Sequence, residues 1–222
     1  MTDLIDCPGC GGAVSRRALT CLSCGGMLNE VPNEVTPELV RSLHGNELPD
    51  LLHSYVAEVF SESGCFNRDG PPDSGVLASL PRVLRVAYTL SILESEVTNG
   101  GFYQWLTNSS GRLTQETLGD LLIIGATAQA DVVSEVVRLN QELESRYESY
   151  RRRWESPQPR GEPSEVDAFW TDMDENYAPQ FDRLSVEYYS LQDSDSAWPR
   201  FDRFAREHID ECAHNRSPPV ND

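Results

Sequence analysis

The chain has 222 residues, a hydrophobic content of 39% and a formal net charge of −18 at pH 7. This length predicts one domain of moderate size with small appendages, and the sequence contains no apolar run long enough to span a membrane. All 18 basic residues are arginines. We expect so acidic a chain to repel nucleic acid and to attract basic protein surfaces. The alternative is that the acidity only maintains solubility.

Two CxxCGG motifs lie near the N-terminus, with ten residues between the cysteine pairs. Tetrahedral Zn²⁺ needs four converging ligands, and this arrangement resembles the short zinc ribbons found at the ends of many bacterial proteins. Because every ligand position is a cysteine, no coordination position is left for water, and the predicted zinc is structural. The predicted ligands are Cys7, Cys10, Cys21 and Cys24.

The alternative to a zinc ribbon is a pair of disulfides. The N-terminus lacks the basic region and apolar run of a signal peptide. We therefore expect a cytoplasmic protein whose thiols stay reduced, which favours zinc. The remaining cysteines, Cys65 and Cys212, are predicted to be unpaired thiols.

The zinc module is predicted over residues 1–28, followed by a linker over 29–35. Thr36 precedes a proline and an acidic residue, a pattern that predicts the capped start of a short helix ending at Gly45. A second helix begins near Leu48, has apolar side chains at helical spacing and ends by residue 64. Glycine, proline and aspartate then predict a loop.

Residues 80–98 are apolar nearly all round, which predicts a central buried helix. The Asn-Gly-Gly sequence at 99–101 predicts its left-handed C-cap, and a short helix follows over 102–108. Thr114 is predicted to cap a helix that runs through Ile124 and stops at the next glycine.

A long helix is predicted from about 128 to 154, and a proline-rich linker follows. Ser164 is predicted to cap the next helix, and Phe181, Leu184 and Tyr188 indicate another. A last helix is predicted to carry Phe201, Phe204, Ala205 and Cys212. The predicted fold is mainly α, a multi-helix orthogonal bundle with a small N-terminal zinc ribbon. Its predicted parts are the ribbon (1–28), a helical domain (36–155), acidic C-terminal helices packed on it (164–213) and a disordered tail (214–222).

The sequence after the central helix is distinctive because two side-chain amides follow a glycine pair. Gln104 and Asn108 are four residues apart and share a helix face, where their amides are predicted to satisfy buried backbone at a helix corner. The aromatic ring of Phe102 is predicted to anchor the corner in the core. The motif residues are Asn99, Gly100, Gly101, Phe102, Gln104 and Asn108.

This NGGFxQxxxN run, with the acidic helix before it, resembles a domain family of bacterial DNA-mimic proteins. The resemblance covers roughly residues 36–150 and is densest over 94–126. It implies an all-helical protein that presents carboxylates to the DNA-binding face of a protein partner. The motif itself is interpreted as architectural and not as a binding site.

The last third of the chain is its most acidic part, with 15 acidic residues and six arginines over 157–222. On the helix predicted from Ser164, carboxylates flank both sides of the apolar stripe, and their spacing is comparable to that of phosphates on a DNA strand. These predicted partner-binding residues are Glu165, Asp167, Asp172, Asp174 and Glu175. The alternative is an ordinary solvated helix face.

The sequence predicts a non-enzymatic protein that binds a basic, nucleic-acid-binding surface of a protein partner, such as a transcription regulator. An immunity-type inhibitor of a toxin nuclease is the first alternative. An enzyme with a site near Gln104 and Asn108 is the second. His208 and Cys212 could form a second metal site, but a packed histidine is the favoured interpretation.

Overall fold

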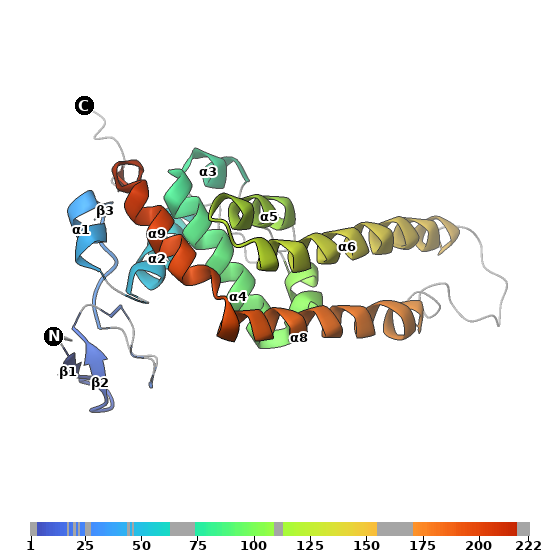
Figure 1. Cartoon of the computed structure of the whole chain (residues 1–222), viewed down its shortest axis with the longest axis horizontal. Helices are drawn as coiled ribbons and strands as arrows, with labels where there is room; N and C mark the ends of the chain where they lie inside the picture. Colours follow the sequence, from blue (N-terminus) through green and yellow to red (C-terminus); the bar gives the residue numbers. More distant parts are fainter. Residues whose placement is uncertain are drawn as a thin grey trace. The chain divides into compact units, whose positions relative to one another are not determined.

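The computed structural model describes residues 4–16, 18–19, 21, 23–24, 28–43, 45, 47–62, 74–108, 113–154 and 171–216, with only the backbone described at 74 and 147–154. The fold is mainly helical, with a small N-terminal hairpin that carries four cysteines, as the sequence predicts (Figure 1). The chain divides into two compact units, residues 1–91 with 198–222 and residues 92–197. Within the described ranges no helix is both long enough and apolar enough to cross a bilayer.

The N-terminal hairpin of the first unit consists of β1 (Leu4–Asp6) and β2 (Ala13–Ser15), which pair antiparallel. Its small core contains the side chains of Cys7, Val14 and Cys21, with Ile5 and Leu28 packed against them. A core of this size buries little apolar surface.

The first two helices of this unit begin where the sequence predicts, whereas a third begins at Ser74, where the sequence predicts a loop. Thr36 caps α1, because its hydroxyl accepts a hydrogen bond of 3.1 Å from the backbone N–H of Leu39. Along the first part of α4, residues 83, 84 and 86–90 are all buried, which confirms the predicted central helix. The helices are α1 (Pro37–Ser42), α2 (Glu47–Glu62), α3 (Ser74–Ser79), the first part of α4 (Arg82–Thr107) and α9 (Ala197–Glu207).

The predicted disordered tail is wrong for residues 214–216, which are held on the first unit. β4 (His214–Asn215) pairs antiparallel with β3 (Glu34–Val35), and the next residue, Arg216, donates from its backbone to the Asn33 carbonyl at 2.8 Å. The Arg216 guanidinium contacts the carboxylates of Glu58 and Glu62 at 3.6 and 3.2 Å. Residues 217–222 lie outside the described part.

The end of α9 also differs from the prediction. The helix stops at Glu207, and a 3-10 turn over Ile209–Glu211, labelled η3, precedes Cys212. Cys212 therefore lies beyond the helix, although its side chain is fully buried.

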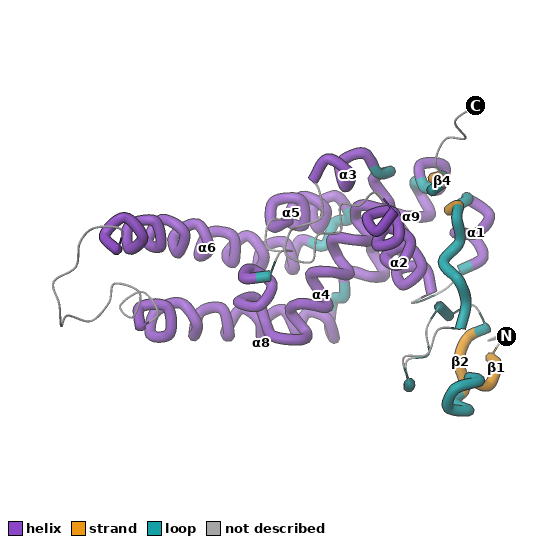
Figure 2. Tube along the Cα trace, turned by 180° about the vertical axis from the view of Figure 1, so that it is seen from behind, coloured by secondary structure: helices purple, strands orange, loops and turns teal. Residues whose placement is uncertain are grey.

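The second unit is built from the last part of α4 and the helices that follow it up to residue 197. α6 and α8 lie side by side (Figures 1 and 2), and the predicted residues Phe181, Leu184 and Tyr188 are buried. The further elements are α5 (Thr114–Ile123), α6 (Thr127–Trp154), η2 (Met173–Tyr177, a π-helix) and α8 (Ala178–Ser194).

Two details of the second unit correct the predicted helix ends. Thr114 is the first residue of α5 instead of its cap, because Leu113 occupies the cap position and makes no side-chain bond there. Gly125 ends α5 as predicted and has a φ of +74°. The predicted linker after residue 155 and the predicted cap at Ser164 lie outside the described residues.

The glycine pair divides α4 into two helical parts, as the sequence predicts, because both glycines have non-helical dihedral angles. Gly100 has φ −158° and ψ 22°, and Gly101 has φ 74° and ψ −176°. The Gly101 conformation is almost confined to glycine and differs from the left-handed helical cap that the sequence predicts. The helix therefore resumes after an abrupt change of direction.

Candidate functional site

The four cysteines of the N-terminal motifs converge on one point. Their sulfur atoms all lie within 4.8 Å of one another, and the Sγ–Sγ distances are 3.7 Å for Cys7–Cys24 and 3.7 Å for Cys10–Cys21. A disulfide requires about 2.05 Å, so these sulfurs are not bonded in pairs. The arrangement has the donors and the spacing to hold one metal ion.

The loop after β1 shapes the first half of this cluster. The backbone N–H of Gly9 points at the Cys7 sulfur at 3.4 Å, and Gly11 has a φ of +73°, which closes the tight turn. Cys7 and Cys21 are buried, whereas Cys10 and Cys24 are exposed. A backbone hydrogen bond from Ser23 lowers the pKa of the Cys21 thiol to about 6, which favours the thiolate form that binds metals.

The predicted partner-binding carboxylates have different environments. Glu165 and Asp167 lie outside the described residues. Asp172 is an ion-pair partner of Arg146 at 2.8 Å, and its side chain is only 14% exposed. By contrast, Asp174 and Glu175 are exposed on the π-helix η2. These last two carboxylates are available to a partner, whereas the charge of Asp172 is compensated within the unit.

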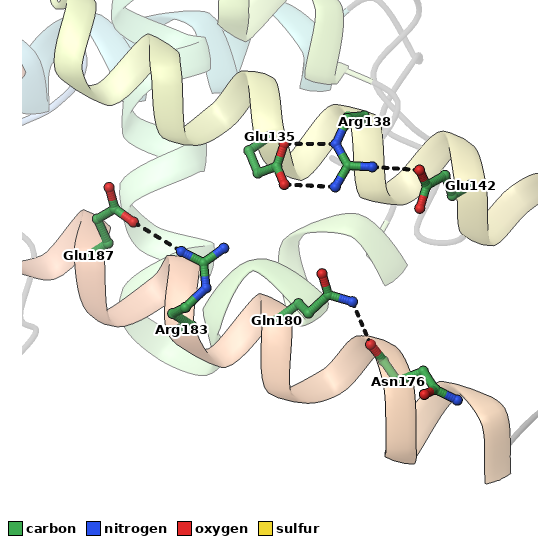
Figure 3. Close-up of polar contacts among 7 residues, drawn as sticks. All are labelled: Glu135, Arg138, Glu142, Asn176, Gln180, Arg183 and Glu187. Carbon is green, nitrogen blue, oxygen red and sulfur yellow. Dashed lines mark hydrogen bonds and ion pairs between the residues drawn. The ribbon is translucent and has the colours of Figure 1, made fainter.

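The facing sides of α6 and α8 carry paired charges (Figure 3). On α6, Arg138 bonds the carboxylates of both Glu135 and Glu142, and its hydrogen bond lowers the pKa of Glu135. On α8, Arg183 lies 3.5 Å from Glu187. This surface is a network of compensated charges, which is typical of a solvated helix face.

The helix α8 carries unpaired carboxylates outside the predicted partner-binding set. Asp182 and Asp193 are exposed and have no ion-pair partner among the residues that the structure describes. Between them lies Val186, a large apolar side chain that is 66% exposed. Positions 182, 186 and 193 recur at helical spacing, so the signal was present in the sequence once the helix was known to continue to Ser194.

The amides of the NGGF motif bind a carboxylate instead of the buried backbone that the sequence predicts. Gln104 and Asn108 both donate to the same oxygen of Glu96, at 2.9 and 2.7 Å. The glycine at position 100 makes room for Gln104, because a Cβ there would lie 2.1 Å from its Oε1 atom. Phe102 is buried, as expected, and its ring packs 5.5 Å from that of Tyr188.

His208 and Cys212 do not form a metal-binding group. The His208 ring packs on Phe204 with centroids 4.3 Å apart, and burial raises the pKa of the Cys212 thiol to about 12. Among the described residues, the N-terminal cysteines are the one group of metal-ligand type whose donor atoms converge.

Comparison with known proteins places the helical part in a family. The family model described as DMP19-like protein matches residues 78–208. This match starts later and ends further along the chain than the predicted resemblance over 36–150, and it includes α8 and α9. No curated protein and no solved structure matches the chain. Because the matched region covers more than half of its residues, the chain belongs to the family of DMP19-like proteins.

Proposed function

We propose that this protein is a non-enzymatic, DNA-mimic-type regulator that occupies the basic, nucleic-acid-binding surface of a protein partner. The observation that carries the proposal is the set of exposed carboxylates on η2 and α8 that no described cation compensates. Family membership and a net charge of −18 support it. An acidic surface of this kind steers a basic partner into contact and disfavours direct binding of nucleic acid.

The proposed contact surface joins two sets of acidic residues. The first is the predicted set, Glu165, Asp167, Asp172, Asp174 and Glu175, and within it Asp172 has the further role of holding Arg146. The second is Asp182 and Asp193 on α8, with Val186 as an apolar contact between them. Positions 182 and 193 lie about 16 Å apart along the helix axis, which is comparable to a few phosphate steps of a DNA strand.

The proposed metal at the N-terminal cluster is structural Zn²⁺. Four thiolates about 2.3 Å from a tetrahedral zinc would lie about 3.8 Å from one another, close to the two Sγ–Sγ distances of 3.7 Å. With four protein ligands the ion has no open position for a substrate or water. Zinc would therefore stabilise the hairpin and take no part in chemistry.

The alternative candidates use the same features differently. An immunity-type inhibitor of a toxin nuclease would present the same acidic surface to another basic partner. An enzyme would need reactive groups near Gln104 and Asn108, yet both amides there are engaged by Glu96, an arrangement that favours an architectural role. We therefore retain the partner-binding function.

Affinity purification from the native host, followed by competition, tests the proposed function. The bait is the full chain, and the matched control bait carries Asp174→Asn, Glu175→Gln, Asp182→Asn and Asp193→Asn. We expect the native chain, and not the control, to retain a basic protein that duplex DNA or RNA displaces. A retained partner that binds this protein and its own nucleic acid simultaneously would contradict the proposal.

A further inference from the structure

The kink in α4 changes the hydrogen bonding of its own backbone. In a regular helix each N–H bonds the carbonyl four residues earlier, which would pair Phe102 with Thr98 and Gly101 with Val97. The dihedral angles of Gly100 and Gly101 interrupt this pattern. Buried backbone groups that lose such partners must be satisfied elsewhere, or each costs the fold free energy.

Side chains of α8 supply the missing partners at the kink. The buried Ser185 hydroxyl accepts a hydrogen bond of 3.0 Å from the Phe102 backbone N–H and itself donates to the Phe181 carbonyl at 2.8 Å. One turn later, the Tyr189 hydroxyl donates to the Val97 carbonyl. Further along, the Gln192 amide donates to the Glu94 carboxylate at 2.9 Å.

These contacts form a polar stripe beside the apolar seam of α8. Positions 185, 189 and 192 follow the i, i+4, i+7 pattern of one helix face. The apolar seam of Phe181, Leu184 and Tyr188 would tolerate some rotation of the helix, because apolar contacts are not directional. Three hydrogen bonds to fixed points on α4 do not tolerate such a rotation of α8, because hydrogen bonds weaken steeply when misaligned.

We propose that the α4 kink and this α8 stripe form a latch that fixes the rotation of α8 about its axis, with Ser185, Tyr189 and Gln192 as positioning residues. Gly101 belongs to the latch, because a Cβ there would lie 2.9 Å from the Ser185 oxygen and would push α8 away. In the latched setting, Asp182 and Asp193 lie roughly a fifth of a turn beyond the stripe, on the exposed flank.

The latch gives the glycine-pair motif a role that the motif alone did not reveal. The motif interrupts the helical hydrogen bonds of α4 at one point, and side chains of α8 bind the backbone groups left there. The latch does not depend on the proposed function. Only its functional consequence, that the α8 carboxylates face a partner in a fixed orientation, rests on that function. The test therefore uses the isolated full chain and no partner.

Hydrogen exchange of the Phe102 amide, followed by NMR, tests the latch directly. Ser185→Ala is expected to speed exchange of this amide about tenfold, since its acceptor is lost, while amides in the middle of α6 keep their rates. The matched control is Ser190→Ala on the same helix, whose hydroxyl donates to the Glu187 carbonyl of its own helix at 2.7 Å. Unchanged exchange in Ser185→Ala, or equal acceleration in the control, would overturn the latch.

Carboxylate labelling tests whether the three contacts act together. In a Ser185→Ala, Tyr189→Phe double variant, Gln192 is unaltered, but α8 is expected to turn and release Glu94. Carbodiimide labelling of Glu94 should then rise severalfold, while labelling of Asp182 and Asp193 stays high. If Glu94 labels as slowly in the folded double variant as in the native chain, the contacts are independent and the apolar seam alone fixes the rotation of α8.

Discussion

At the scale of single residues, Gly101 carries two separate constraints. Its φ of 74° with ψ of −176° lies in a region that side chains with a Cβ rarely adopt. The space on the Cβ side is also filled, because the Ser185 oxygen would lie 2.9 Å away. Gly100 has an extended φ, so its constraint is different: the Gln104 side chain covers it.

We expect Gly101→Ala to lower the free energy of unfolding by about 1–3 kcal/mol, because the native backbone becomes strained. Gly119→Ala is the matched control, since this glycine is helical, has an open Cβ side and should gain up to about 1 kcal/mol. Urea denaturation followed by circular dichroism measures both. Equal stability of Gly101→Ala and the native chain would contradict the strained assignment.

The cysteine cluster gives a second prediction at this scale. Purified protein should contain one zinc per chain by elemental analysis, and Cys7→Ser should lose it, because three thiolates and a hydroxyl bind Zn²⁺ far less tightly. Cys65→Ser changes a thiol outside both motifs and should keep the metal. Chelation should leave most helical circular dichroism in place, since the helices have their own cores; its global loss would show that the hairpin and helices fold as one.

At the scale of elements, the two-residue strands β3 and β4 join distant parts of the chain and bring His214 beside Tyr55. The Tyr55 hydroxyl lies 2.7 Å from the His214 Nδ1 atom, and the Arg216 guanidinium lies over the Tyr55 ring. Burial lowers the pKa of His214 below its ordinary value of 6.5, and burial does the same to His53. Both histidines are therefore neutral in the folded chain under conditions that protonate them in the unfolded chain.

We expect the free energy of unfolding to fall as the pH is lowered through 6.5. Below this pH the unfolded chain binds more protons than the folded one, and the loss continues until the lowered folded-state pKa values are reached. Denaturant titrations at pH 7.5 and 5.5 measure the difference. It should be smaller in His214→Gln and smallest in the His53→Gln, His214→Gln double variant; an unchanged difference in the double variant would assign the pH dependence to other groups.

An element could be predicted from the sequence where the interactions that form it are between residues close in sequence. The buried first part of α4 and the Thr36 cap of α1 followed from apolar spacing and capping chemistry, and the cysteine spacing indicated the metal-type cluster. Strands of two residues have no alternation to detect, so β3 and β4 were missed. Ser185, Tyr189 and Gln192 resemble ordinary polar surface residues until α8 is placed against α4, and the ion pair of Asp172 likewise depends on a residue 26 positions away.

At the scale of the whole molecule, the distribution of unpaired charge tells more about where a basic partner would bind than the net charge of −18 does. Glu135 and Glu142 share one arginine, and Glu187 lies beside another, so these acids add little field beyond their own surface. Asp182 and Asp193 have no such neighbour among the described residues. The three compensated acids and the two uncompensated ones thus differ in what they can offer a basic partner, although each counts equally in the formal charge.

The final prediction separates local recognition from overall charge. Asp182→Asn with Asp193→Asn should slow association with the partner more than it speeds dissociation, because exposed charges act mainly on the encounter. Glu116→Gln with Asp131→Asn removes the same charge from exposed positions on α5 and α6 and should have a smaller effect. Association rates measured by surface plasmon resonance between about 50 and 200 mM salt should fall for the native chain, since exposed charges are screened over about 8–10 Å near physiological ionic strength. Equal losses in the two variants would mean that the acidity acts only through the total charge, and rates indifferent to salt would mean that charge does not drive the association.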